Sequence, residues 1–375
     1  MIRIQNIYHM LAYAFQVLRE DGLRVLGQED FAHVEDLYAA ILSRGMADLA
    51  RRGLRRNYVT QANDLRSPRG KIDISDTLKR QLIRRQRLSC QYDEFCEDTL
   101  ANQVLKATAR RLLRIQDVRP ETKADLKRSL QFFEQVTNVE FRRIRWDAIL
   151  VPAQARLEQM LLAVCRMAIN QQLIAEKDGG ARMKAFADDQ AMSALYERFV
   201  RNYLKKHFPQ YTVSASYVDW ALDEGSDTLL LPAMRTDITL EKLDRMLIID
   251  TKYYAHVLQN YRDKLTLHSA NLYQVLTYLD NAQAGRSIPV SGALLYARTD
   301  EEIVPDQRYL VHGKQLWVRT LDLNQPFQII EEQVQCFMRD WETTASKRNL
   351  DAQSEAHNRI LHMTKTNTQS NDRHK

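Results

Sequence analysis

The sequence predicts an α/β protein of two domains, in which an α+β N-terminal domain precedes an α/β C-terminal domain. In the first half, apolar residues at helical spacing mark several helices, with strand and turn residues between them. In the second half, two β-rich segments separated by a charged turn indicate a hairpin, and a helix follows it. At 375 residues the chain is long enough for each domain to bury its own core.

The N-terminal elements follow in order along the chain. Apolar spacing predicts helices over residues 7–19 and 34–52, short strands and turns over 54–74, and a β-rich middle after them. Glu97 and Asp98 precede a predicted helix over 100–113, where carboxylates suit the unpaired N–H groups of a helix start. Further helices are expected over 121–135, where Pro120 begins the stretch, and over 157–174, before Gly179 and Gly180 break the chain.

The C-terminal elements begin with an amphipathic helix over 192–208. Strands are predicted over 235–240 and 246–253, with the turn at 241–245, and a helix over 269–279 has Ser269 as its N-cap. We place the domain boundary between about 150 and 190, which gives domains of 1–165 and 166–345. Residues 346–375 are polar with few large apolar side chains, so a disordered tail is expected there.

The predicted hairpin carries charged residues inside an apolar sheet. Because side chains alternate along a strand, Asp250 and Lys252 share one face while Thr251 faces the other, and Asp237 arrives from the neighbouring strand. Two carboxylates and a lysine are costly to bury unless something neutralises them. A divalent metal ion would do so, and carboxylate oxygens are the ligands that Mg²⁺ prefers.

The spacing of these residues has the form D-x(12)-D-x-K, which is the shape of the PD-(D/E)xK nuclease signature. In this interpretation Asp237 and Asp250 hold the metal ion beside a scissile phosphate, and Lys252 orients the attacking water or offsets developing charge. The alternative is an edge-strand ion pair between Asp250 and Lys252, with Asp237 as a turn acid.

Two helical residues extend this candidate site. Gln274 and Tyr278 lie four apart and therefore on one helix face, and Q-x-x-x-Y after the D-x-K strand resembles the extra motif of RecB-like nucleases, whose glutamine approaches the active site. The alternative is a helix with one polar face. Glu197, on the helix before the sheet, is a candidate third carboxylate, or else a solvated acid that pairs with Arg201.

With these residues in view, the chain resembles the McrC family, the nuclease subunit of the McrBC modification-dependent restriction system. The resemblance runs in order over residues 4–279. Its motifs are Asn6-Ile7-Tyr8 with Met10-Leu11-Ala12-Tyr13-Ala14 at the start, Glu97-Asp98-Thr99-Leu100-Ala101-Asn102 in the middle, and in the core Leu230-Leu231-Pro232, Thr236-Asp237-Ile238-Thr239, Asp250-Thr251-Lys252-Tyr253-Tyr254, His268-Ser269 and Asn271-Leu272-Tyr273-Gln274.

The resemblance implies a Mg²⁺-dependent PD-(D/E)xK endonuclease domain behind an N-terminal domain that docks on a GTP-hydrolysing, McrB-like AAA+ ring. The sequence has no G-x-x-x-x-G-K-[ST] loop, so GTP would be bound by that partner. Recognition of methylated DNA would also belong to the partner, since no base-flipping pocket can be read here. Two alternatives remain: a non-catalytic DNA-binding or NTPase-stimulating adaptor with a nuclease-like fold, and a stand-alone RecB-like exonuclease.

Positive charge is concentrated near the start of the chain. Residues 51–89 contain twelve Arg or Lys and three Asp, about +9, which exceeds the formal +6 of the whole chain. A polyanion or an acidic protein surface is the expected neighbour of such a stripe. The candidate contacts with DNA or with the partner are Arg69, Lys71, Arg84, Arg85 and Arg87. Pro68 and Gly70 mark a turn within the stripe, and in the family it would be a tip inserted into the ring.

Other features exclude some classes of protein. No run of eighteen apolar residues and no signal-peptide pattern occurs, so a cytoplasmic protein without membrane contact is expected. Four cysteines lack the spacing of a zinc site and the density of a disulfide framework, which predicts reduced thiols.

Overall fold

The computed structural model describes residues 2–18, 23, 25–175, 181–253, 257–261, 264–298 and 303–344. It divides into two compact units, one of Ile7–Ala191 and one of Met1–Asn6 with Met192–Lys375. The division lies next to the upper end of the range of about 150 to 190 in which the sequence places the domain boundary, and beyond the nominal bound of 165. The expected tail over 346–375, the glycine pair at 179–180 and Tyr254 lie outside the described residues.

Helices form most of the N-terminal unit. They are α1 (Ile4–Ala14), whose first three residues belong to the other unit, α3 (Val34–Arg52), α5 (Leu100–Leu112), α6 (Pro120–Gln131) and α7 (Arg156–Ala175). Helix α3 packs against α5, α6 and α7, and it buries Leu37, Ile41 and Met46 completely. Apolar residues at helical spacing thus meet in one core, as their pattern predicts. Helices 34–52 and 100–113 match the prediction within one residue, whereas the first helix ends at Ala14, earlier than predicted.

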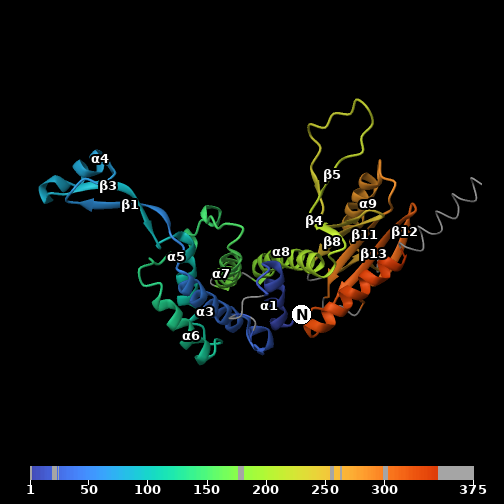
Figure 1. The fold of residues 1–375 in the computed structure, drawn as a ribbon, viewed down its shortest axis with the longest axis horizontal. Coiled ribbons are helices and arrows are strands. Elements are labelled where there is room, and N and C mark those ends of the chain that lie inside the picture. Colours follow the sequence, from blue (N-terminus) through green and yellow to red (C-terminus); the bar gives the residue numbers. More distant parts are fainter. Residues whose placement is uncertain are drawn as a thin grey trace, which may run out of the picture. The chain divides into compact units, whose positions relative to one another are not determined.

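A long β-hairpin arm extends from these helices (Figure 1). Strand β1 (Asn57–Leu65) pairs antiparallel with β3 (Leu88–Cys96), and β2 (Lys71–Ile72) pairs on the other side of β3. The arm also contains α4 (Ile74–Lys79) and the 3-10 turn η2 (Leu82–Arg85). Gly70, with φ of +67°, allows the turn before β2, because a Cβ there would lie 2.4 Å from the Gln91 carbonyl oxygen.

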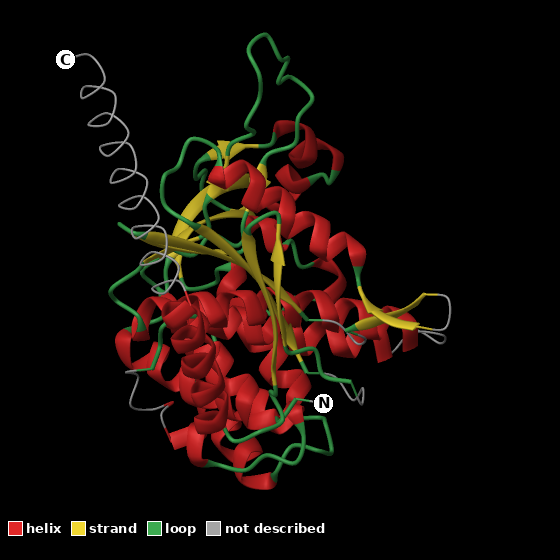
Figure 2. Ribbon diagram, turned by 90° about the vertical axis from the view of Figure 1, so that its right-hand side faces the viewer, coloured by secondary structure: helices red, strands yellow, loops and turns green. Residues whose placement is uncertain are grey.

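A mixed six-stranded sheet is the centre of the C-terminal unit (Figure 2). Its order is β12 (Gln307–Val311), β13 (Lys314–Leu321), β11 (Val290–Ala297), β8 (Arg245–Lys252), β7 (Ile238–Lys242) and β4 (Thr212–Ser214). Strand β11 runs parallel to both β8 and β13, and the remaining pairs are antiparallel. The predicted hairpin is present as β7 and β8, with a turn of only Leu243 and Asp244.

Helices cover both faces of this sheet, so β8 is buried along nearly its whole length. Helix α9 (Ser269–Gln283) packs on the face that carries Ile248 and Leu294. The opposite face carries Trp317, whose ring meets Phe337 from a helix over 327–344. Because α9 lies so close to the sheet, the position beneath it is Gly292, where a Cβ would meet Val275 at 2.7 Å.

Smaller elements complete the unit. Helix α8 (Ala181–His207) begins earlier than the predicted 192, and its residues up to Ala191 belong to the N-terminal unit. Two short ladders, β5 (Tyr217–Val218) with β6 (Met234–Arg235) and β9 (Leu258–Tyr261) with β10 (Lys264–Leu267), flank the sheet.

The chain start is tied to the C-terminal unit by hydrogen bonds. The buried Asn6 side chain donates to the carbonyl oxygens of Leu323 at 2.7 Å and Gln325 at 2.8 Å, and the Arg3 N–H donates to Leu323 at 3.1 Å. The Asn6 of the N-terminal motif therefore has a structural role that its position in the sequence did not reveal.

Candidate active site

The candidate site lies at the carboxyl end of β8. Asp250 and Lys252, two residues apart, point to the face covered by α9, as the alternation predicted. The side chain of Asp250 is only 1% exposed and that of Lys252 is 13% exposed. Lys252 Nζ lies 2.7 Å from Asp250 Oδ2, so the ion pair that the sequence left as an alternative is present.

Asp237 lies at a bend immediately before β7 rather than within a strand, which corrects the predicted strand bounds. The register of the hairpin, in which Ile238 pairs with Ile249, brings this bend opposite the end of β8. Asp237 Oδ2 accepts hydrogen bonds from Thr251 N–H at 2.8 Å and from Thr251 Oγ1 at 2.9 Å. Sequence reasoning missed Thr251, since alternation places it on the face away from Asp250.

Gln274 reaches the same place from α9. Lys252 Nζ donates to Gln274 Oε1 at 3.1 Å, and Gln274 Nε2 donates to the Tyr278 hydroxyl at 3.0 Å. The Tyr278 hydroxyl in turn donates to the Arg235 carbonyl oxygen at 3.1 Å. The two polar residues of the Q-x-x-x-Y pattern thus connect Lys252 to the backbone just before Asp237.

Glu197 is half-buried on α8 and pairs with Arg201 at 2.6 Å, the contact that the sequence offered as its alternative. The same Arg201 guanidinium also donates to the Asp237 carbonyl oxygen at 3.1 Å. Glu197 is close enough to Asp250 for its negative charge to raise the pKa of that carboxyl group. The structure therefore brings Glu197 to the edge of the site while engaging it in an ion pair.

Burial raises the pKa of the Asp250 carboxyl group from its usual 3.8 to about 6. Lys252 opposes this shift by its positive charge, whereas the negative charges of Asp237 and Glu197 add to it. Three acids, Asp237, Asp250 and Glu197, thus face two cations, Lys252 and Arg201, at the end of β8.

The carboxylate oxygens of Asp237 and Asp250 are the possible metal ligands of this site. Asp250 Oδ2 is buried and lies 2.7 Å from the Lys252 ammonium group, which leaves the other carboxylate oxygen of Asp250 for a metal ion. Among the described residues, no three His, Cys, Asp or Glu side chains gather into a metal site. Two carboxylates with waters and substrate oxygens in the other positions are the usual environment of Mg²⁺, so Asp237 and Asp250 fit that ion.

The E-D-T-L-A-N segment serves the fold of the N-terminal unit. Asp98 accepts hydrogen bonds from Thr137 N–H at 2.7 Å and from its hydroxyl at 3.0 Å. Thr99 caps α5, and the Asn102 side chain donates to the carbonyl oxygens of Arg55 at 3.0 Å and Glu97 at 2.8 Å. The motif therefore joins α5 to the base of the arm.

The basic stripe does not form one uncompensated face. Its first members pair with acids outside the stripe, among them Arg55 with Glu158 at 2.6 Å and Arg56 with Glu97 at 2.8 Å. On the arm, Arg69 stacks over Tyr92 and lies 3.5 Å from Glu94. Exposed side chains on the arm include Lys71, Arg84, Arg85 and Arg87, of which Arg87 donates to the Asp64 carbonyl oxygen at 3.3 Å.

Cys90, Cys96, Cys165 and Cys336 are free cysteines. Within the described residues, no helix combines the length and apolar character needed to cross a membrane.

The fold and the site define an α/β protein with two carboxylates and a lysine at the end of a central strand. A family model described as McrBC 5-methylcytosine restriction system component matches residues 4–297. The chain therefore belongs to this family of restriction-system components.

Individual relatives were also found. The chain is 25% identical over 336 residues to the type IV methyl-directed restriction enzyme EcoKMcrBC of Escherichia coli K12, covering 89% of this chain and 96% of that protein. A solved assembly of Thermococcus gammatolerans McrB AAA+ hexamers with bound McrC is similar with a TM-score of 0.42 and 14% identity, over 88% of this chain and 76% of that one. The McrBC complex of the same organism gives a TM-score of 0.34 and 18% identity over 56% and 60% of the two chains.

Proposed function

We propose that this chain is the DNA-cleaving subunit of a modification-dependent restriction complex, a Mg²⁺-dependent endonuclease of the PD-(D/E)xK class. The observation that carries this proposal is the convergence of Asp237, Asp250 and Lys252 at the carboxyl end of β8, where the buried Asp250 carboxyl group has a raised pKa although Lys252 Nζ lies 2.7 Å from it. A buried carboxylate of this kind costs free energy in the folded protein, which a cation would recover.

Asp237 and Asp250 would hold the metal ion, which when bound would polarise the scissile phosphate and lower the pKa of a coordinated water. Thr251 keeps Asp237 in place through two hydrogen bonds, so that its second carboxylate oxygen stays available. Asp250 is rigidly placed because it belongs to a strand that is hydrogen-bonded to both β7 and β11. Such fixed ligands reduce the reorganisation that substrate binding would otherwise require.

Lys252 is held at the site from two sides, by Asp250 and by Gln274 Oε1 at 3.1 Å. Its ammonium group would position the attacking water and stabilise the charge that develops on the phosphate. Gln274 acts on the orientation of this ammonium group, and Tyr278 fixes the amide of Gln274. In this scheme Gln274 is a positioning residue, whereas Lys252 contacts the reacting atoms.

A McrB-like AAA+ GTPase ring is the proposed partner. Membership of the family supports this, and the Thermococcus assembly is described as McrB AAA+ hexamers with bound McrC. The arm offers a surface for such a partner, because Ile74, Leu78 and Ile83 are each more than half exposed beside its arginines. Exposed apolar side chains gathered on one element are typical of a protein-binding surface.

Cleavage of methylated DNA by the purified chain with Mg²⁺, with and without the ring partner and GTP, tests the proposal. Asp237→Ala should abolish cleavage while fold and partner binding persist, because the metal ligand is lost and the two Thr251 hydrogen bonds lost with it belong to a single bend of the hairpin. Asp244→Ala is the matched control, since this acid lies at the far end of the same hairpin, in an ion pair with Arg245. It should cleave like the wild type.

Retention of wild-type cleavage by Asp237→Ala would refute the assignment of the metal ligand. A wild-type chain that stimulates the GTPase and binds DNA but never cleaves it would indicate the non-catalytic adaptor instead. Cleavage that needs neither partner nor GTP would favour the stand-alone nuclease.

A further inference from the structure

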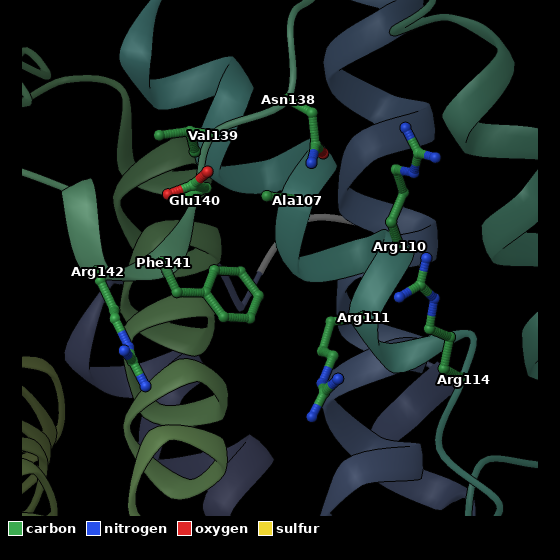
Figure 3. A pocket seen from close by; sticks show the side chains of 9 residues that line it. All are labelled: Ala107, Arg110, Arg111, Arg114, Asn138, Val139, Glu140, Phe141 and Arg142. Atoms are coloured by element: carbon green, nitrogen blue, oxygen red, sulfur yellow. The ribbon is translucent and has the colours of Figure 1, made fainter. Parts of the chain in front are cut away.

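A pocket of about 380 Å³ lies in the N-terminal unit beside the end of α5, away from the arm residues considered above (Figure 3). Two segments form its opposite sides, the last turn of α5 and the stretch that contains the 3-10 turn η3 (Phe141–Arg143). Four of its nine lining residues are arginines, namely Arg110, Arg111, Arg114 and Arg142. One acid, Glu140, accompanies them.

Three of the four arginines that line this pocket have no acidic partner among the described residues. Among the described residues, no carboxylate lies within ion-pair distance of Arg110, Arg114 or Arg142. Glu140 is already engaged, because it pairs with the neighbouring Arg143 at 3.0 Å. Arginines that line one pocket from both sides make its electrostatic potential positive, which favours the binding of an anion there.

The helix itself accounts for only part of this arrangement. Cations are stabilised near a helix C-terminus by the partial negative charge of its last carbonyl groups, which suits Arg110 and Arg111 in the last turn of α5. Arg142, however, comes from a different segment, and its side chain is exposed. A helix-end effect therefore does not explain why a second segment adds an arginine to the same pocket.

Apolar and aromatic groups accompany the arginines. The half-buried Phe141 ring points into the gap toward α5, and Ala107 lines the pocket from the helix (Figure 3). A few residues further on, Trp146 is half-buried under the guanidinium of Arg166, 5.7 Å from its ring centroid. Alternating arginines and aromatic rings suit the phosphates and sugars of a nucleic acid better than an acidic peptide.

We propose that this pocket binds phosphate groups of the DNA backbone, with Arg110, Arg114 and Arg142 as the charge-bearing contacts. Guanidinium groups bind phosphate oxygens by paired hydrogen bonds, and such contacts provide affinity that is independent of base sequence. The inference rests on the proposed DNA substrate, but it concerns binding alone and adds a contact outside the basic stripe.

Fluorescence anisotropy with a labelled 30-base-pair duplex, in EDTA so that no cleavage occurs, tests the proposal across salt concentrations. The triple variant R110A/R114A/R142A should bind roughly 10²- to 10³-fold more weakly at 0.1 M salt. Its plot of log K against log salt should be shallower by about 2.7, since each lost phosphate contact removes about 0.9 from the slope. The lysine variant R110K/R114K/R142K keeps the charges and should retain the slope.

The matched control is Arg145→Ala, which removes an arginine of the same segment that does not line the pocket and whose charge is already balanced by Asp147. It should bind DNA within a few-fold of the wild type. If the triple alanine variant does not fold, Arg114→Ala alone should still reduce the slope by about 0.9.

Three results would overturn the proposal. An unchanged affinity and slope in the folded triple variant would exclude a phosphate contact. Equal losses in Arg114→Ala and in the control Arg145→Ala would indicate general charge instead of this pocket. Binding of GTP that is lost in the triple variant and does not compete with the DNA would assign the pocket to a mononucleotide. A wild-type chain that binds DNA through the pocket yet fails to cleave would overturn only the proposed nuclease activity.

Discussion

Asp250 should limit the stability of the metal-free protein, and Asp250→Asn should therefore unfold at a higher denaturant concentration than the wild type at neutral pH. The carboxyl group is 1% exposed, and its pKa is raised to about 6 from the usual 3.8. That difference corresponds to roughly 3 kcal/mol between the charged and neutral forms. Asparagine has nearly the same shape and carries no charge, so it mimics the neutral form.

The sign of the effect follows from proton binding. Between pH 3.8 and about 6 the folded protein holds a proton at Asp250 that the unfolded chain has released. Stability from this group is therefore greatest below pH 3.8, falls as pH rises through this window, and stays at its lowest value above it. The advantage of Asp250→Asn should be near zero at pH 4 and approach about 3 kcal/mol at pH 8.

Urea unfolding of the C-terminal unit in EDTA, at several pH values between 4 and 8, measures this difference directly. Added Mg²⁺ should stabilise the wild type and narrow the gap, because a ligand that binds only the folded state raises its stability. The same addition should leave Asp250→Asn nearly unchanged.

Asp244→Asn is the matched control on the same hairpin. The Arg245 guanidinium beside Asp244 lowers the pKa of that carboxyl group, so removal of its charge should bring no gain in stability at any pH. The reasoning is refuted if Asp250→Asn is no more stable than the wild type at pH 8, or if both asparagine variants gain equally.

Two further predictions concern Lys252 and the arm. Lys252→Ala should slow single-turnover cleavage, because the loss of one electrostatic stabiliser raises the activation free energy by roughly 3–4 kcal/mol. If the variant melts at a lower temperature but each folded molecule cleaves at the normal rate, Lys252 is only a structural partner of Asp250. Reversal of the exposed Arg84, Arg85 and Arg87 to Glu should weaken DNA binding and flatten its salt dependence if the stripe contacts DNA. Loss of association with the ring partner, at an unchanged salt slope, would make the arm a protein-docking surface instead.

Local pattern determined much of this protein's structure. Apolar spacing alone placed the helix at 34–52, because a helix that faces one core must repeat its apolar residues every three or four positions. Alternation placed Asp250 and Lys252 on one face of a strand, since neighbouring side chains point in opposite directions. In both cases the helix or strand is set by the positions of side chains that lie within a few residues of one another in the chain.

The prediction was less accurate where distant segments meet. Asp237 lies at a bend and is held by Thr251, a contact that alternation argued against. Helix α4 and the turn η2 form within the arm, in a stretch that was read as β-rich. Division of the chain between Ala191 and Met192 depends on how helices pack, and no composition change marks it.

Residue types and their spacing predict the groups of the candidate site, which are two acids, a lysine and a glutamine on strands and a helix. The contact of Lys252 with Gln274, the hydrogen bond of Asn6 to Leu323, and the meeting of arginines from two segments at one pocket follow from tertiary packing. Lys252 and Gln274 are 22 positions apart in the chain, and Asn6 and Leu323 are 317 positions apart. Packing of the whole chain sets such distances, whereas local periodicity constrains only residues within a few turns.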